Sequence, residues 1–198
     1  MTRRGARPPS LTALSVIVLL AGCASSPNPV MYTVEPVPGL QRSGVPQVIV
    51  LEQISLERYL ERSQIVQSSY YYRLNVMNNN WWGEPLDAML SRVLVDELQQ
   101  RLAPAVVVSE TGAISPTAGA TVSVNILRLD EDARGMLVLE AQYGVTFHAR
   151  AAPVLRSFRF VMAPPVRGVA GEVAAITTAV GRLSDAIAAA VAVGPRAR

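Results

Sequence analysis

The sequence predicts an α/β fold, a two-layer sandwich in which two helices pack on one face of a mixed, largely antiparallel sheet. Several runs of residues alternate apolar and polar side chains, which is typical of strands that expose one face to water. Two longer segments repeat apolar residues every three or four positions, as helices with one buried face do. The expected order of elements is β-β-α-β-β-β-β-α, in a single domain over residues 47–198.

Two strands are expected before the first helix. Residues 47–54, QVIVLEQI, form an apolar, β-branched run that is typical of a buried strand. A polar excursion over residues 56–67 separates this run from residues 69–77, SYYYRLNVM, which we expect to form the second strand. The three asparagines Asn78–Asn80 then predict a turn.

A helix and a third strand follow this turn. Pro85 suits the first turn of a helix, and Pro104 closes it. The apolar positions of the segment have helical spacing and predict its buried face: Leu86, Met89, Leu90, Val93, Leu94 and Leu98. Residues 105–109, AVVVS, are expected to form the next strand, and residues 112–120 a loop.

The clearest alternation lies in the second half of the chain. Residues 121–126 and 136–149 alternate apolar and polar side chains, and DEDARG, residues 130–135, reads as the hairpin connection between them. Residues 156–162, RSFRFVM, add a strand that ends at Pro164–Pro165.

The last element is expected to be a long helix that ends at Gly194 and Pro195. Its apolar residues step by threes and fours and predict the buried face: Val169, Val173, Ile176, Val180, Leu183, Ile187 and Val191.

Residues 1–22 read as a signal peptide. Three arginines precede a short apolar run, Leu11–Leu20, which ends in small residues. The four residues Leu20-Ala21-Gly22-Cys23 resemble the lipobox of bacterial lipoproteins. In that group the cysteine thiol receives a diacylglyceryl group, the chain is cut before it, and the new amino terminus is acylated. The resemblance implies that Cys23, the single cysteine of the chain, is the site of lipid attachment.

Residues 23–46 are expected to form a lipidated, proline-rich tether. Five prolines in this segment favour an extended polyproline II conformation, which suits a slack connection between lipid and domain. The short stretch VMYTV, residues 30–34, provides an alternative, since it has the composition of an edge strand.

The charge of the mature chain argues against nucleic acid as a partner. All 18 basic residues are arginines; three lie in the leader, and the remaining 15 balance the 15 acidic residues, which all follow Cys23. The mature protein is therefore nearly neutral, and we find no Lys/Arg-rich run of the kind that binds nucleic acid.

The motifs of common enzymes are also missing from the sequence, which has no G-x-S-x-G, no phosphate-binding loop and no H-E-x-x-H. We therefore expect a protein that is not an enzyme and that uses no cofactor and no metal. The candidates for function are exposed aromatic residues, which are enriched at interfaces. We expect Tyr71, Trp81 and Trp82 to gather at one end of the sheet around the predicted turn, with Arg73 stacked on Tyr71 as part of the same interface.

The run from Val48 to Leu102 resembles the ABC-type transport auxiliary lipoproteins, the family of paraquat-inducible protein C. The similar stretches are MYTV (residues 31–34), YLERSQIV (59–66) and WGEPL (82–86), the last of which opens a helix. The resemblance covers about residues 31–102 and implies an α/β domain with helices packed on a sheet.

The resemblance also implies a function. Members of this family serve transporters built on mammalian cell entry (MCE) domains, which move lipids between the inner and outer membranes. Ala24 after the lipidated cysteine implies the outer membrane as the destination, with the domain facing the periplasm. The expected role is docking to an MCE-domain protein of the inner membrane, as a monomer or as one copy in a homo-oligomeric ring.

Three alternatives remain open from the sequence. The protein could be a structural or pilot lipoprotein of another envelope assembly, which the anchor and tether would serve equally well. It could carry lipid directly, in which case the fold should contain a wide apolar cavity. An envelope hydrolase is the third alternative, disfavoured because no nucleophile and base occur as a recognisable pair.

Overall fold

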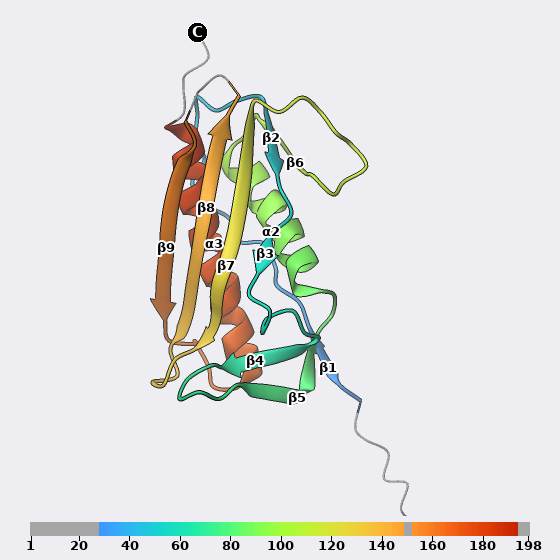
Figure 1. Cartoon of the computed structure of the whole chain (residues 1–198), viewed down its shortest axis with the longest axis vertical. Coiled ribbons are helices and arrows are strands. Elements are labelled where there is room, and N and C mark those ends of the chain that lie inside the picture. Colours follow the sequence, from blue (N-terminus) through green and yellow to red (C-terminus); the bar gives the residue numbers. More distant parts are fainter. Residues whose placement is uncertain (1–27, 149–151, 194–198) are drawn as a thin grey trace, which may run out of the picture.

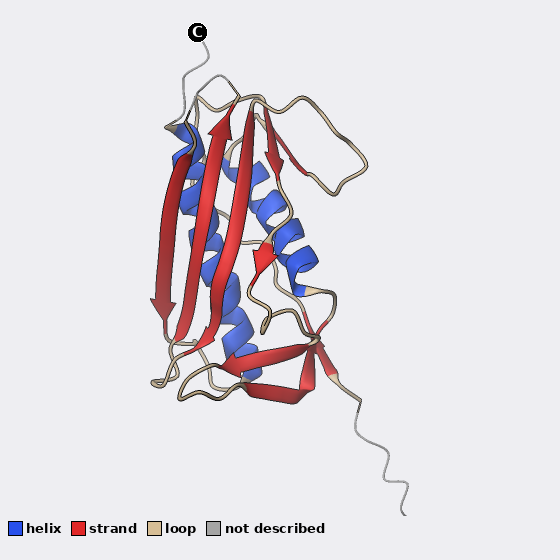
Figure 2. Ribbon diagram, in the orientation of Figure 1, coloured by secondary structure: helices blue, strands red, loops and turns tan. Residues whose placement is uncertain are grey.

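The computed structural model describes residues 28–148 and 152–193, which form one nine-stranded sheet and two helices (Figure 1). The strands are β1 (Val30–Tyr32), β2 (Val48–Leu51), β3 (Ser55–Leu56), β4 (Gln64–Ser68), β5 (Asn75–Trp82), β6 (Val106–Ser109), β7 (Ala120–Glu131), β8 (Leu137–Phe147) and β9 (Val154–Met162). The helices are α2 (Leu86–Arg101) and α3 (Val169–Ala192), and both cover the same face of the sheet (Figure 2). The predicted two-layer α/β class is confirmed.

Strand β7 organises the sheet. On one edge it pairs antiparallel with β8, which in turn pairs antiparallel with β9, and these are the longest ladders. Its other edge pairs with three short strands, β2, β3 and β4, all of them parallel to it. Strand β6 flanks β2, while β5 and β1 flank β4. The sheet is therefore mixed and largely antiparallel, as the sequence predicts.

Both helices and the four strands between them follow the predicted order, but five strands instead of two precede α2. Residues 64–68, expected in a polar excursion, form β4, because Ile65 and Val66 are both buried. The predicted turn at Asn78–Asn80 lies inside β5, and the chain turns at residues 69–74 instead. Strand propensity depends on context, and asparagines are accommodated where β5 is partly exposed between β4 and β1.

The core lies between the sheet and the helices. All six predicted apolar positions of α2 are buried, as are the predicted positions of α3 from Val173 to Val191. Helix α3 is long and apolar enough to span a bilayer by composition, but more than half of its apolar stretch is buried inside the domain. Its apolar face is thus explained by packing on the sheet.

The segment before Gln47 is packed on the domain as well. Strand β1 pairs with β5, as expected from the alternative in which residues 30–34 form an edge strand. Beyond it, Val34 is 1% exposed, and the backbone N–H of Val37 donates to Glu97 of α2 (2.9 Å). Residues 30–37 are therefore held against the domain, whereas the boundaries of leader, tether and domain stay predictions.

A buried polar network joins this segment to both helices at Arg101. The guanidinium donates to Asp185 of α3 (2.7 Å), to the carbonyl of Gly181 (3.2 Å) and to the carbonyl of Val37 (3.1 Å). Nearby, Glu97 accepts a hydrogen bond from Ser184 of α3. Burial raises the pKa of Glu97, and the bonds from Ser184 and Val37 act in the opposite direction. A buried charge is tolerated only when it is paired in this way.

Gly181 lets the N-terminal segment approach α3 closely. A Cβ at this position would lie 2.3 Å from the side chain of Val37. In an open helix interior, Gly to Ala stabilises by up to about 1 kcal/mol. Here we expect Gly181→Ala to lower the free energy of unfolding by about 1–3 kcal/mol in urea titrations, because Val37 must move and its neighbours with it.

The double variant Gly181→Ala/Val37→Ala tests whether overlap with the Val37 side chain causes this loss of stability. It should recover most of the loss, since the second change removes the methyl group that is overlapped. A single variant that is as stable as the parent would show that Val37 does not pack on α3 at Gly181.

Candidate functional site

Cys23, the predicted lipid attachment site, lies outside the described residues. The described chain starts at Asn28, five residues later. Asn28 is itself held at the domain, because its carbonyl accepts a hydrogen bond from the side chain of Asn79 in β5 (3.4 Å). Cys23 is therefore only five residues away in the sequence from a residue that is hydrogen-bonded to the sheet.

The structure does not assemble the predicted aromatic cluster. Tyr71 and Arg73 lie in the turn before β5, and Trp81 and Trp82 lie at the end of that strand. Strand β5 separates these positions, because Asn75 pairs with Ser68 at one end of β4 and Trp81 pairs with Gln64 at the other. The prediction of a shared cluster is wrong because it assumed a turn at residues 78–80, where the chain is in fact extended.

The two tryptophans also differ in burial. Trp82 is 5% exposed and belongs to the core, so it offers no surface for a partner. Trp81 is half-buried, pairs with Met31 of β1 and donates its indole N–H to the carbonyl of Asn78 (3.0 Å). Within the predicted set, the exposed members are Tyr71 and Arg73, and their role at an interface stays a prediction.

The turn at residues 69–74, which we call the tyrosine turn, is the most exposed aromatic feature of the described chain. Tyr71 is 75% exposed, Tyr72 is fully exposed, and Tyr70 packs edge-on against Tyr71 with ring centroids 5.2 Å apart. The alternating pattern predicts a strand over residues 69–77 that includes Tyr72. The sequence does contain an indication of the turn, the Ser68-Ser69 pair, since adjacent serines are typical of a turn.

The backbone of this turn is strained. Tyr71 and Tyr72 have φ angles of 51° and 60°, in the left-handed region that favours glycine and asparagine. Each such residue costs of order 1 kcal/mol. Three adjacent aromatic side chains in a strained and exposed turn add nothing to the core, which favours an interaction with a partner or a surface.

Next to this end of the sheet lies a group of buried acidic side chains. Asp130 of β7 is buried and accepts hydrogen bonds from Tyr59 (2.9 Å) and Arg128 (2.8 Å). Glu172, in the first turn of α3, is equally buried, but neither of its carboxyl oxygens has a hydrogen-bond partner among the described residues. Burial, together with the charges of Glu131 and Asp130, raises the pKa of Glu172 to about 8.

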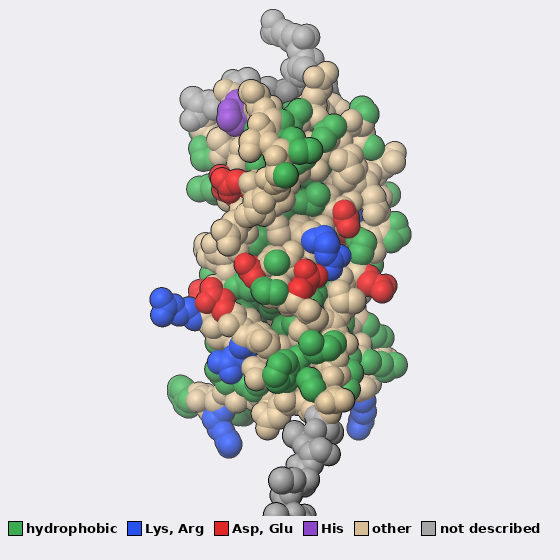
Figure 3. All heavy atoms as spheres, turned by 90° about the vertical axis from the view of Figure 1, so that its right-hand side faces the viewer, with side chains coloured by type: hydrophobic (Ala, Val, Ile, Leu, Met, Phe, Trp, Pro, Cys, Tyr) green, Lys and Arg blue, Asp and Glu red, His purple; other side chains and the backbone are tan. Residues whose placement is uncertain are grey.

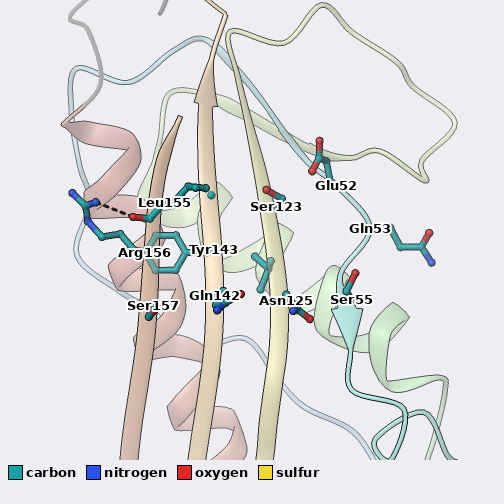
Figure 4. A pocket seen from close by; sticks show the side chains of 12 residues that line it. Glu52, Gln53, Ser55, Ser123, Asn125, Gln142, Tyr143, Leu155, Arg156 and Ser157 are labelled. Carbon is teal, nitrogen blue, oxygen red and sulfur yellow. Dashed lines mark hydrogen bonds between the residues drawn. The ribbon is translucent and has the colours of Figure 1, made fainter. Parts of the chain in front are cut away.

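A shallow groove of about 500 Å³ lies on the sheet face opposite the helices (Figure 4). Its walls come from the chain between β2 and β3 and from the outer faces of β7, β8 and β9. Most of the lining residues are polar, including Glu52, Ser123, Asn125 and Gln142, although the surface they expose in the groove is more apolar than polar, and Leu155 is the exposed apolar member. The groove is shallow and open, so it would leave an acyl chain largely in contact with water.

The described residues include no group of three or more His, Cys, Asp or Glu side chains that could hold a metal. His148 is exposed and lies 3.3 Å from the hydroxyl of Thr121.

Comparisons with known proteins place the sequence in a family. Residues 32–188 match the family model described as an ABC-type transport auxiliary lipoprotein component. The match extends the region of resemblance found from the sequence, residues 31–102, to the end of the second helix. No curated protein matches the sequence.

Solved structures share the fold. A crystal structure of an uncharacterized protein superimposes with a TM-score of 0.68 at 20% identity, covering 82% of this chain and 98% of that chain. Protein XCC0632 from Xanthomonas campestris, a DUF330 protein, gives 0.65 at 15% identity, with 82% and 93% covered. A PelC dodecamer from Paraburkholderia phytofirmans is less similar, with a TM-score of 0.43 at 10% identity over 75% of this chain and 90% of that chain.

The tyrosine turn should be dispensable for stability. We expect Tyr72→Asn to leave the melting temperature unchanged or to raise it by about 2–4 °C, because asparagine adopts a positive φ more readily than tyrosine. Trp82→Ala is the contrasting variant and should cost about 3–5 kcal/mol, since it empties a core site. A large loss of stability in Tyr72→Asn would contradict the assignment of this residue to a surface role.

Glu172 should make the protein less stable as the pH rises. The pKa of its carboxyl is about 8 in the folded state and 4.5 in the unfolded state. The folded state therefore holds its proton between these values while the unfolded state releases it, and stability is lost progressively across that window. We expect Glu172→Gln to remove this pH dependence and to be more stable than the parent by about 1–3 kcal/mol at pH 8, after the cost of a buried amide.

Denaturant melts between pH 5 and pH 8 measure this effect. Glu140→Gln is the matched control, because Glu140 is on the solvent side of β8 in an ion pair with Arg159 (2.9 Å). If the parent and Glu172→Gln respond identically to pH, then Glu172 is not a buried, protonated carboxyl.

Proposed function

The chain belongs to the ABC-type transport auxiliary lipoproteins, and from that premise we propose that it is an outer-membrane-anchored docking subunit of an MCE-type, ABC-linked lipid transport system. The observation that carries the proposal is the family match over residues 32–188, together with the lipobox-like residues 20–23 immediately before it. In this role the domain faces the periplasm and holds the end of a transport assembly of the inner membrane close to the outer membrane.

Anchoring depends on Cys23. Each buried methylene of an acyl chain contributes about 0.8 kcal/mol, so several chains hold a protein far more firmly than one. Ala24 directly after the cysteine supports the outer membrane as the destination. The first strand of the domain begins only seven residues beyond Cys23, at Val30, so the anchor and the fold stay close together.

The mechanism we propose is docking through surface complementarity, without a catalytic step. The exposed Tyr71, Tyr72 and Arg73 are side chains of the kinds that concentrate contact energy, whether the contact is a protein or the membrane surface. The nearly neutral mature chain favours contacts that depend on shape more than on long-range attraction. A homo-oligomeric ring of this chain is compatible with the role and remains part of the proposal.

Direct carriage of lipid is the less favoured alternative. A carrier needs an apolar cavity large enough for acyl chains. The groove on the outer face of the sheet is shallow and open and does not enclose a ligand, which supports docking over carriage. A structural or pilot role in another envelope assembly is separated from our proposal by the identity of the partner.

The anchor is tested with Cys23→Ser. We expect the variant to accumulate as an uncleaved precursor, to incorporate no labelled palmitate and to leave the outer-membrane fraction, because serine cannot form the thioether. Ser25→Ala, two residues away, is the control and should be processed normally. Equal labelling of Cys23→Ser and the parent would refute the assignment.

The partner is tested with the lipidated parent protein. After chemical cross-linking in cells, affinity purification and mass spectrometry should recover an MCE-domain protein, and recovery should fall at least tenfold in Cys23→Ser. Recovery of a different envelope assembly in place of an MCE-domain protein would favour the pilot role and reject ours.

A further inference from the structure

Three connections leave the sheet at one end. The paired residues at this end form a continuous row across five strands: Asn75 of β5 with Ser68 of β4, Ser68 with Glu131 of β7, Glu131 with Leu137 of β8, and Leu137 with Met162 of β9. The connections that leave this row are the tyrosine turn, residues 132–136 and residues 163–168. We call this the tyrosine end; it is the lower end in Figure 1.

The tyrosine end exposes apolar and aromatic side chains. Tyr70, Tyr71, Tyr72 and Leu74 are all exposed in the first connection, and Val166 is exposed in the third. A monomeric domain seldom presents so many large apolar side chains together unless they contact something. The strain at Tyr71 and Tyr72 points the same way, because the chain keeps these residues at a cost in stability.

Each of the three connections also carries an exposed arginine: Arg73, Arg134 and Arg167. Two partly exposed carboxylates, Glu131 and Asp132, lie in the same region, so the three arginines outnumber them. Asp132 accepts hydrogen bonds from the backbone N–H groups of its own turn, and Glu131 is half-buried in the ladder. In the view of Figure 3, arginine and hydrophobic side chains occupy the lower part of the surface, while the acidic side chains lie in its middle and upper parts.

The described chain begins at the same, lower end of the molecule in Figure 1, next to β1. Asn28 is bonded to Asn79, and β1 pairs with residues 80–82, so the chain enters at the end of β5 that lies across the sheet from the tyrosine turn. Cys23 lies five residues before Asn28, a stretch that spans at most about 17 Å when fully extended. An acylated Cys23 therefore brings this end of the domain, and not the opposite end, next to the lipid.

We propose that the tyrosine end rests on the surface of the membrane that holds the anchor, with Tyr71 and Tyr72 in the headgroup region and Arg73, Arg134 and Arg167 facing anionic phospholipid headgroups. Tyrosine rings favour this region because one end is apolar and the other polar, and each arginine near an anionic surface adds to the attraction. This inference rests on the proposed anchoring through Cys23.

The orientation has a consequence for docking. The long strands β7, β8 and β9 would stand away from the membrane, and the opposite end, with β2, β6 and residues 110–119, would project into the periplasm. A partner arriving from the inner membrane would then meet that far end first.

Site-specific fluorescence on the lipidated protein tests this orientation. In the mature lipoprotein the sulfur of Cys23 is consumed by the lipid, so Tyr72→Cys provides a single reactive thiol for an environment-sensitive dye. Ile114→Cys, exposed in the connection at the opposite end, is the matched control. Both labelled proteins are reconstituted into vesicles of phosphatidylethanolamine and phosphatidylglycerol that contain spin-labelled lipid.

We expect the dye at position 72 to shift to shorter wavelength and to be quenched at least twofold, and the dye at position 114 to behave as in water. Replacing phosphatidylglycerol by phosphatidylcholine, or adding Arg73→Glu, should weaken the quenching at position 72. Quenching at position 114 alone, or at neither position, would overturn the proposal.

Flotation of the vesicles separates this proposal from the one on which it rests. If the lipidated protein does not float with vesicles, the anchor itself fails. If it floats but position 72 stays in water, the anchor holds and the membrane contact of the tyrosine end is refuted.

Discussion

The fold depends on how the charge of Arg101 is satisfied. This side chain is 1% exposed, and an unpaired charge at such a site would cost several kcal/mol. Its partners come from three parts of the chain: α3 through Asp185 and Gly181, α2 through the carbonyl of Glu97, and the N-terminal segment through Val37. Arg101 thus holds α2, α3 and the N-terminal segment around Val37 in one arrangement. The buried contacts of the core therefore set the direction in which the N-terminal segment approaches the domain.

Strand β7 fixes the arrangement of the sheet in a similar way. One of its edges carries the long antiparallel ladders, and its other edge holds three short parallel strands in a row. Strand β4 pairs with the end of β7 at Glu131, which fixes where the β4–β5 hairpin lies. The tyrosine turn is therefore attached to a rigid element although it is itself a loop. A contact surface held in this way loses little conformational entropy when it binds.

The elements that were predictable from the sequence are those whose burial follows a regular period. The stripes of α2 and α3 and the alternation of β7 and β8 carry this signal, and so both helices lie where expected. The hairpin of β4 and β5 carries no such signal: Tyr70, Tyr72, Leu74 and Val76 alternate like a strand, yet the first three lie in a turn. With that turn misplaced by several residues, Tyr71 and Trp82 were grouped although one is exposed and the other is core. Family membership was accessible because MYTV, YLERSQIV and WGEPL are contiguous motifs and need no tertiary structure.

Two departures from local rules occur close together, and their position argues for function. Tyr71 and Tyr72 hold a strained backbone, and Glu172 is a buried carboxyl without a hydrogen-bond partner. Both features lower the stability of the folded state, and both lie at the end of the sheet where Ser68 pairs with Glu131, whose charge acts on Glu172. Sequences that fold well obey local rules except where another requirement prevails. In the anchoring that we propose, lipid holds the domain at one end, and the other requirement at that end is the membrane itself. An acyl anchor fixes distance but leaves the domain free to tilt, and a second contact at the tyrosine end would remove that freedom and present the far end to a partner.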